Sequence, residues 1–156
     1  MNEIAPKDIT IAIRFDCAVL QGISLHHSPR LEELQALLPP SSTRAYRKSN
    51  AYLPTLILDD LGLVFRYREE SRTVALVDIC FAVSKSVDKP TTPFPGTVIL
   101  NDQHLRRPFP LSSLKAGATF PFDTRPVAAA GSSRIGVSIV PKFEYIGMIN
   151  FGWKEE

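Results

Sequence analysis

The sequence predicts an α+β fold in which one main helix packs on one face of an antiparallel β-sheet. Residues 56–83 carry most of this prediction, because they hold the densest β-forming residues of the chain, with polar breaks where tight reversals are needed. Residues 9–15 add a strand with alternating apolar and polar side chains. Residues 28–38 add the helix, with leucines at helical spacing, Ser-Pro at its start and two prolines after its end.

The length of 156 residues predicts a single domain, 1–156, that buries roughly two-thirds of the surface exposed by the unfolded chain. A net charge of +2 is too small to indicate nucleic-acid binding, which normally requires a concentrated basic surface. The N-terminus lacks the pattern of a secretory signal, and no apolar run is long enough to span a bilayer. We therefore expect a cytoplasmic protein with neither a nucleic-acid nor a membrane partner.

The first strand places its apolar side chains on one face, at Ile9, Ile11, Ile13 and Phe15. Cys17 and Val19 continue this alternation, and Gly22 interrupts it before 23–25. The interruption predicts a hairpin or a bulged strand.

The helix follows, with Ser28 as its expected cap and Pro29 in its first turn. Its apolar face should pack on the sheet through Leu31, Leu34 and Leu38. Pro39 and Pro40 end it. Residues 41–50 are polar and basic without periodicity, which is typical of a surface loop with solvated arginines.

The central stretch predicts three strands joined by reversals at 59–62 and 69–72. The second strand is expected to present Leu63, Phe65 and Tyr67 to the core, with Val64, Arg66 and Arg68 on its other face. The third is expected to present Ala75, Val77, Ile79, Phe81 and Val83 to the core, with Val74, Leu76, Asp78 and Cys80 opposite.

The rest of the chain predicts shorter elements. Prolines predict that residues 85–96 are a loop, which Phe94 anchors to the core. The turn residues Asn101 and Asp102 predict a short hairpin over 97–105. Leu111 and Leu114 indicate one helical turn, and 116–134 has few periodic cues. Residues 135–153 are rich enough in β-branched and aromatic residues for two strands, bent at Pro141 or Gly147.

Candidate metal ligands are few. His26 and His27 are adjacent, so an extended chain points them to opposite sides, and no recognised ligand spacing includes them or the distant His104. Cys17 and Cys80 lie in apolar, strand-like surroundings, which is typical of reduced core cysteines. We expect no metal and no cofactor.

Candidate catalytic groups are also weak. Asp59-Asp60 and Glu69-Glu70 are adjacent acidic residues, and paired carboxylates can act as acid and base. Both pairs occupy predicted turns, where solvated acidic side chains are common. No cleft is indicated there that would shift the pKa of a carboxylate. The sequence contains no nucleophile elbow, phosphate-binding loop or dinucleotide fingerprint. We therefore expect a protein that is not an enzyme, in which the acidic turns could meet a basic partner.

The mixed face of the central strands is the best candidate surface. Arg66 and Arg68 alternate with Val64 there and adjoin Leu76 and Asp78. This face could be a second covered layer satisfied by an Arg66–Asp78 pair, or a surface for a partner, since arginine and large apolar residues are favoured in interfaces. The candidate partner-binding residues are Arg66, Arg68, Leu76, Asp59, Asp60, Glu69 and Glu70.

The order of segments over 19–114 resembles an uncharacterised bacterial domain family. In that family a short helix precedes a D-x-L-G-I strand start, a hairpin and an F-x-G-x-L-x-I-x-G strand. The first motif is matched here by 59–63, and the second by Phe94, Gly96, Val98 and Leu100, whereas Asp102 or Gln103 stands where the family tends to have glycine. Such domains are often encoded beside toxins of contact-dependent or type VI secretion systems.

The resemblance implies an immunity protein that neutralises a cognate protein toxin by direct, stoichiometric binding. Stiff proline-containing loops and charged turns fit such a role, because they lower the ordering entropy of binding and can steer a partner. Two alternatives stay open: an enzyme or small-ligand-binding protein whose pocket has no sequence motif, and a structural subunit of a secretion apparatus.

Overall fold

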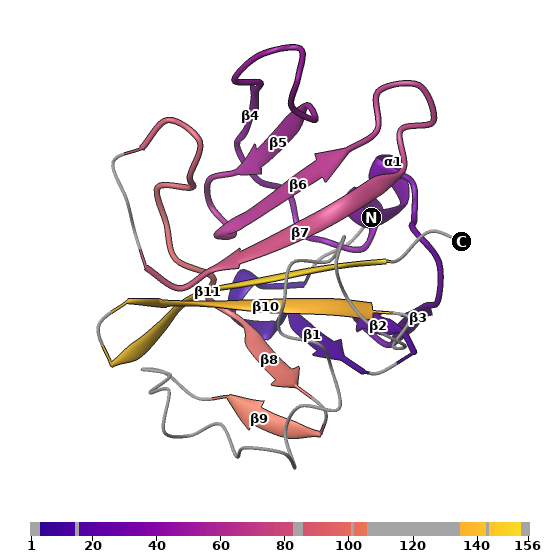
Figure 1. Cartoon of the computed structure of the whole chain (residues 1–156). Helices are drawn as coiled ribbons and strands as arrows, with labels where there is room; N and C mark the ends of the chain where they lie inside the picture. The colour runs from indigo at the N-terminus through magenta and orange to yellow at the C-terminus, as the bar shows by residue number, and fades with distance from the viewer. Residues whose placement is uncertain are drawn as a thin grey trace.

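The computed structural model describes residues 4–14, 16–82, 86–100, 102–105, 135–142 and 144–153. These residues form two β-sheets, one 3-10 turn, η1 (Pro6–Asp8), and one α-helix, α1 (Leu31–Ala36) (Figure 1). The five-stranded sheet has the order β3 (Ile23–Leu25), β2 (Ala18–Leu20), β1 (Thr10–Ile13), β8 (Thr97–Leu100) and β9 (Gln103–Leu105). The six-stranded sheet has the order β10 (Ile135–Lys142), β11 (Tyr145–Trp153), β7 (Val74–Cys80), β6 (Leu63–Tyr67), β5 (Thr55–Leu58) and β4 (Thr43–Tyr46).

The described part of the chain is mostly β, so antiparallel sheet is confirmed but the α+β class with one main helix over 28–38 is not. The helix has only six residues, and Arg30 rather than Ser28 occupies its N-cap. It begins late because Pro29 and Arg30 are extended and pair with the start of β7, where the Val74 N–H donates to the Pro29 carbonyl (2.8 Å). The two prolines that follow it end it, as predicted.

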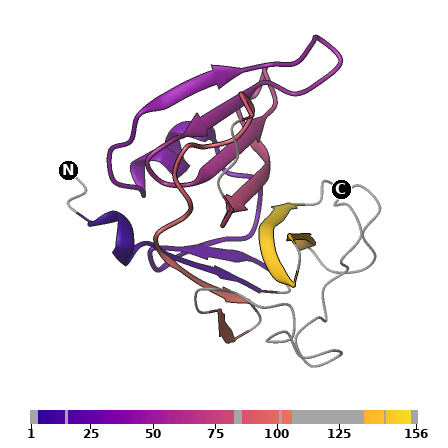
Figure 2. The same ribbon diagram turned by 90° about the vertical axis from the view of Figure 1, so that its left-hand side faces the viewer.

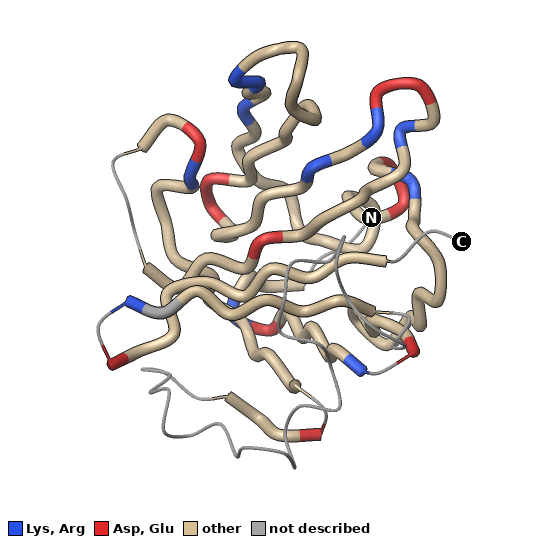
Figure 3. The backbone as a smooth tube through the Cα atoms, in the orientation of Figure 1, with Lys and Arg blue, Asp and Glu red and all other residues tan. Residues whose placement is uncertain are grey.

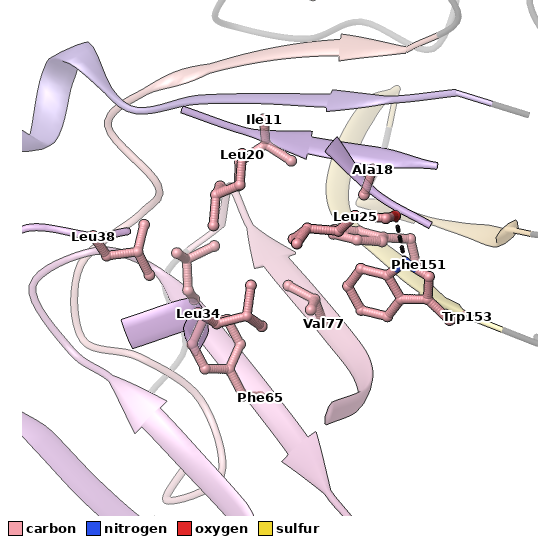
Figure 4. Close-up of a pocket in the computed structure, with 11 residues that line it drawn as sticks. Ile11, Ala18, Leu20, Leu25, Leu34, Leu38, Phe65, Val77, Phe151 and Trp153 are labelled. Atoms are coloured by element: carbon pink, nitrogen blue, oxygen red, sulfur yellow. Dashed lines mark hydrogen bonds between the residues drawn. The ribbon is translucent and has the colours of Figure 1, made fainter. Parts of the chain in front are cut away.

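The main hydrophobic core lies between the two sheets, which Figure 2 shows one above the other. The helix contributes Leu31 and Leu34 to this core, as predicted, and Leu38 joins them from the segment just after the helix. Side chains from both sheets and from α1 converge on one small space of about 10 Å³ (Figure 4). This is the room that one water molecule needs, so the space cannot hold a small ligand.

The start of the five-stranded sheet is an antiparallel meander of β1, β2 and β3, so the predicted reversal at Gly22 is confirmed. The predicted continuation of the first strand through Cys17 and Val19 is wrong, because the chain already reverses between Ile13 and Ala18. Ala18 and Leu20 therefore join the core instead. Gln21 (φ 53°) and Gly22 (φ 81°) make the second turn of the meander, and the Gln21 side chain accepts a hydrogen bond from the Thr10 N–H (2.7 Å). Strand β1 also pairs in parallel with β8, from Thr10 opposite Thr97 onward. The sequence did not predict this pair, because partners so distant in the chain leave no local signal.

Strands β5, β6 and β7, which come from the central stretch, form the middle of the six-stranded sheet, as predicted. Val83, which was predicted to face the core, lies outside the described residues. The predicted core positions Leu63, Phe65, Val77 and Ile79 are all buried. The predicted alternation fails only at the start of β7, where the register shifts so that Val74 pairs with Tyr67 and Ala75 is the extra residue. Val74 therefore joins the core in place of Ala75.

Residues 41–50 were predicted as a surface loop but contain the edge strand β4, which pairs with β5. The two strands predicted over 135–153 are confirmed as the β10–β11 hairpin, which has an irregular register between Val140 and Pro141. Phe94 is buried, as predicted. The helical turn expected near 111–114 and the segment 116–134 lie outside the described residues.

Gly62 fixes the β5–β6 turn against the loop that follows β7. It has a positive φ of 64°, and a Cβ at this position would lie 2.2 Å from the Phe94 backbone nitrogen. Gly62→Ala should therefore lower the free energy of unfolding by about 3 kcal/mol, the sum of left-handed strain and overpacking. Gly22→Ala is the matched control, because Gly22 has a positive φ but nothing within 4 Å of its Cβ position. It should cost only about 1 kcal/mol in urea unfolding; equal losses would contradict this account of Gly62.

Candidate partner-binding groove

An open groove of about 440 Å³ lies on the face of the six-stranded sheet that points away from the five-stranded sheet. We call it the outer groove; its lining residues are Tyr46, Lys48, Ala51, Tyr52, Leu53, Thr55, Arg66, Leu76 and Asp88. They come from four neighbouring strands and from the two loops beside them. The groove is therefore an assembled site rather than one segment of the chain.

The floor of the outer groove is one cross-strand row of side chains. Register places Tyr46 opposite Thr55, Thr55 opposite Arg66, and Arg66 opposite Leu76, on β4, β5, β6 and β7. Facing residues on antiparallel strands lie on the same face of the sheet, so the four side chains form a continuous surface. Thr55 is buried, whereas the other three are partly exposed.

One wall of the outer groove is the loop between β4 and β5, residues 47–54. The Arg47 guanidinium holds this loop by donating to the carbonyls of Tyr52 (2.9 Å) and Asn50 (3.4 Å), and the Tyr52 N–H donates to Ser49 (3.0 Å). The Lys48 ammonium lies 5.2 Å from the centre of the Tyr52 ring, within range of a cation–π contact. The wall is thus held in place by its own polar contacts.

The opposite wall is the loop after β7, which Arg44 holds against the sheet. Its guanidinium donates to the carbonyls of Val87 (3.0 Å) and Lys89 (2.9 Å). The same guanidinium makes a two-pronged ion pair with Asp59, at 2.6 Å and 3.0 Å. Asp59 also accepts the Thr91 N–H (3.1 Å). We call this arrangement the Arg44 clamp.

The loop held by the Arg44 clamp covers a second, smaller apolar cluster on the outer face. Ile57, Val64 and Cys80 are buried there, with Met148 packed beside them. The Lys89 ammonium approaches the Met148 sulfur (3.7 Å). Burial, with the nearby Asp78 carboxylate, raises the pKa of the Cys80 thiol to about 12, so this cysteine is a neutral core group as predicted.

Asp78 lies in the same covered layer and is fully buried. Its Oδ2 lies 2.9 Å from Arg66 Nη2, and its Oδ1 accepts a hydrogen bond from the Asn150 side chain. The Arg66–Asp78 pair that the sequence predicted is therefore present. The geometry at Oδ2 is an ion-pair contact without a well-formed hydrogen bond, so Arg66 is the main compensation for a buried carboxylate oxygen.

Of the predicted partner-binding residues, the structure brings Arg66 and Leu76 together in the outer groove. Asp59 is buried in the Arg44 clamp, and Asp60 accepts the Ser42 N–H (2.8 Å) beside it. Arg68, Glu69 and Glu70 lie at the β6–β7 turn and do not line the groove. Glu69 is engaged there in an ion pair with Arg47. Both turns therefore support the fold, and their role toward a partner stays a prediction.

Sequence reasoning missed the groove residues that lie outside the central stretch 56–83, namely Tyr46, Lys48, Ala51, Tyr52, Leu53, Thr55 and Asp88. Segment 41–50 was expected to be a solvated loop, and the available signal was the two tyrosines, Tyr46 and Tyr52, that lie within and just after this basic segment. Figure 3 shows that lysine and arginine positions gather at the end of the molecule that carries β4 to β7. The outer groove contains tyrosine and arginine, which are enriched in protein interfaces.

Comparison with protein-family models, curated proteins and solved structures finds no match to this chain. The resemblance to the toxin-associated family therefore stays a prediction. Within the described residues, no helix is long and apolar enough to cross a membrane.

The Arg44 clamp predicts a pH-dependent contribution to stability. The hydrogen bonds from Arg44, with smaller contributions from Thr91, lower the pKa of Asp59 in the folded state. This contribution is complete above the unfolded pKa of about 3.9 and is lost as the pH falls through the lower, folded value. Asp59→Asn should lower the free energy of unfolding at pH 7 by about 1 kcal/mol. The difference from wild type should shrink as urea unfolding is repeated at successively lower pH, below about pH 4.

The control for loss of one negative charge is Glu70→Gln, at an exposed position. An Asp59→Asn deficit that is the same at pH 3 and pH 7 would show that the ion pair is not its cause.

The buried carboxylate of Asp78 predicts a strong dependence on Arg66. Arg66→Met should lower the free energy of unfolding by about 3 kcal/mol, because it leaves that carboxylate without its cation. Adding Asp78→Asn should recover most of the loss, since asparagine carries no charge and can still accept from Asn150. Arg68→Met is the control on the same strand end. Additive effects in this double-mutant cycle would contradict the pairing.

Proposed function

We propose that the protein is a stoichiometric immunity protein that binds a cognate protein toxin through the outer groove. The observation that supports this binding site is the groove itself, where Arg66 and Leu76 lie beside two exposed side chains, those of Tyr52 and Leu53. The class of partner follows from the resemblance to domains encoded beside secreted toxins. In this proposal the chain acts in the cytoplasm by occupying its partner, without turnover.

The exposed apolar groups around the outer groove support a protein partner. Tyr52 is 53% exposed and Leu53 is 39% exposed on one wall, and Val87, next to the lining residue Asp88, is 63% exposed on the other. Large side chains that stand in solvent beside a depression lose apolar surface when a partner covers them. An apolar side chain of the toxin, inserted between the two walls, would bury all three.

The rigidity of both walls supports binding with little ordering cost. Arg47 fixes the wall that bears Tyr52, and Arg44 fixes the wall that bears Val87. Because neither wall must fold on contact, more of the contact energy appears as affinity. Tyrosine adds to this effect, since it offers a large contact area with only two side-chain torsions to immobilise.

Arg66 supplies the polar specificity of the proposed site. Its side chain is 34% exposed, with one end of the guanidinium on Asp78 and the rest of the side chain lining the groove. A carboxylate or main-chain carbonyl of the toxin can accept from the remaining N–H donors, in the fork geometry that arginine favours. Such a contact would orient the toxin segment so that the immunity protein either plugs its active site or holds it inactive.

The proposal predicts that Tyr52 is a binding hot spot. Tyr52→Ala should weaken binding to the toxin encoded by the adjacent gene by at least about thirtyfold, equivalent to about 2 kcal/mol, in calorimetry with the purified pair. Tyr145→Ala is the matched control, because Tyr145 is a comparably exposed tyrosine that does not line the groove. It should leave binding unchanged.

Growth in cells provides the second measurement. Wild type and Tyr145→Ala should restore growth when co-expressed with the toxin, and Tyr52→Ala should not. The proposal is wrong if no complex forms with the neighbouring gene product and co-expression does not restore growth. If Tyr52→Ala binds the toxin as tightly as wild type does, the immunity function stands but the binding site is not the outer groove.

The volume of the outer groove favours a second candidate, a small-ligand-binding protein. About 440 Å³ falls within the range of small-molecule sites, and Lys48, Arg66 and Asp88 offer polar groups around an apolar floor. A thermal-shift screen of small metabolites separates the two candidates. A metabolite that stabilises wild type but not Leu76→Trp, in which the floor is filled, would favour the small ligand over the protein partner.

A further inference from the structure

The end of the β1–β2–β3 meander brings three metal-ligating side chains together. Ligand atoms of Asp16, Cys17 and His26 all lie within 4.8 Å of one another. Asp16 and His26 are exposed, whereas Cys17 is only 4% exposed, so the cluster has one buried and two accessible ligands. The outer groove uses none of these residues.

Strand register explains why the cluster forms. Ala18 pairs with Leu25 in the β2–β3 hairpin, so one further step along the antiparallel ladder places Cys17 opposite His26. Facing residues at such positions have Cβ atoms about 5 Å apart, which is close enough for both side chains to reach one ion. Asp16 joins them because it directly precedes Cys17, in the link between β1 and β2.

The backbone on both sides of the cluster is held in place. The Arg14 N–H donates to the Cys17 carbonyl (2.9 Å), which extends the β1–β2 pairing to the residue that bears the thiol. The Trp153 indole N–H donates to the Leu25 carbonyl (2.9 Å), immediately before His26, as Figure 4 shows. A hydrogen-bonded backbone on each side lowers the reorganisation that an ion would require.

We propose that Asp16, Cys17 and His26 form a binding site for a divalent transition-metal ion of the Zn²⁺ class. A thiolate, an imidazole and a carboxylate are all zinc ligands, with bond lengths of about 2.0–2.3 Å. In a tetrahedral site these bonds put neighbouring ligand atoms about 3.5 Å apart, so the observed cluster closes around an ion by small side-chain rotations. Sulfur and nitrogen donors do not suit Mg²⁺ or Ca²⁺, which prefer oxygen.

The charge of the cluster fits a dication. The carboxylate of Asp16 and the thiolate of Cys17 together carry two negative charges once the thiol proton has left, which matches one M²⁺ ion. Binding therefore forms a metal–sulfur bond, breaks the S–H bond and releases the proton to water. Three protein ligands leave the fourth tetrahedral position to water or to a ligand from another molecule.

The sequence offers a matched control for the histidine and for the cysteine of the cluster, because each has a counterpart of the same residue type outside the cluster. His27 is adjacent to His26, and Cys80 is the second cysteine, buried in the other sheet. Neither belongs to the cluster. The four variants to compare are Cys17→Ser, His26→Ala, Cys80→Ala and His27→Ala.

The experiment titrates Co²⁺ into the full chain, without an affinity tag, and follows the absorption spectrum. Wild type should bind one Co²⁺ per chain, with a thiolate-to-cobalt charge-transfer band and the visible bands of a tetrahedral ion, and Zn²⁺ should displace it. Cys17→Ser should abolish the charge-transfer band. His26→Ala should weaken binding by at least about tenfold, whereas Cys80→Ala and His27→Ala should bind as wild type does.

Circular dichroism of each variant separates ligand loss from unfolding. His26→Ala keeps the test decisive even if Cys17→Ser does not fold, because His26 is exposed and outside the core. Wild type that takes up no Co²⁺ or Zn²⁺ overturns the proposal, as does binding that survives His26→Ala or that falls equally with His27→Ala. The result is independent of the toxin assay, since neither Tyr52 nor the toxin takes part.

Discussion

Burial of β6 and β7 on both faces is the constraint on which the rest of the structure depends. Their inner face packs against the five-stranded sheet and α1, and their outer face carries Val64, Asp78 and Cys80, which are also buried. Strands buried on both sides normally require a cover of other elements. Here the cover on the outer face is a loop with little secondary structure of its own, so side chains must hold it to the sheet. The Arg44 clamp on Asp59 meets that requirement, and it explains why the DDLG turn is occupied in maintaining the fold.

The outer groove is where this cover ends. The row that contains Ile57, Val64 and Asp78 lies beneath the loop, and the next row, from Tyr46 to Leu76, does not. Arg66 stands at the boundary, because it compensates the buried carboxylate while facing the groove. In the proposed complex, its stabilising role and its role in recognising the partner would therefore compete for one guanidinium. A partner gains a contact with Arg66 only to the extent that it leaves the Asp78 ion pair intact.

The alternation of apolar and polar residues along the sequence predicted the strands that turn one face toward the core. The alternation at Leu63 and Phe65 placed the core side of β6, and the same logic predicted that Arg66 and Asp78 would pair. It failed for β4, because the half-buried positions of that edge strand are Arg44 and Tyr46, which do not form an apolar stripe. It also overestimated α1, since Pro29 and Arg30 are extended by pairing with β7.

The candidate sites were less predictable than the fold because both depend on long-range pairing. Tyr52 and Leu53 line the groove from a loop that Arg47 helps to hold. His26 was set aside because no ligand lies at a recognised sequence spacing, yet the hairpin register brings Cys17 opposite it. The hairpin itself was predicted, so extending its register by one step is the signal that could have found this cluster.

A short chain of contacts connects the two candidate sites. Leu76 in the groove floor pairs with Gly152, and the neighbouring Trp153 donates to the carbonyl of Leu25, the residue before His26. Contiguity of this kind couples two sites only if an element between them has two arrangements that both sites can bias. Trp153 is buried in the main core, and Gly152 fits closely against the Ala75 carbonyl, where a Cβ would lie 2.2 Å away. Close packing on both leaves no second arrangement, so the metal cluster and the outer groove should act independently.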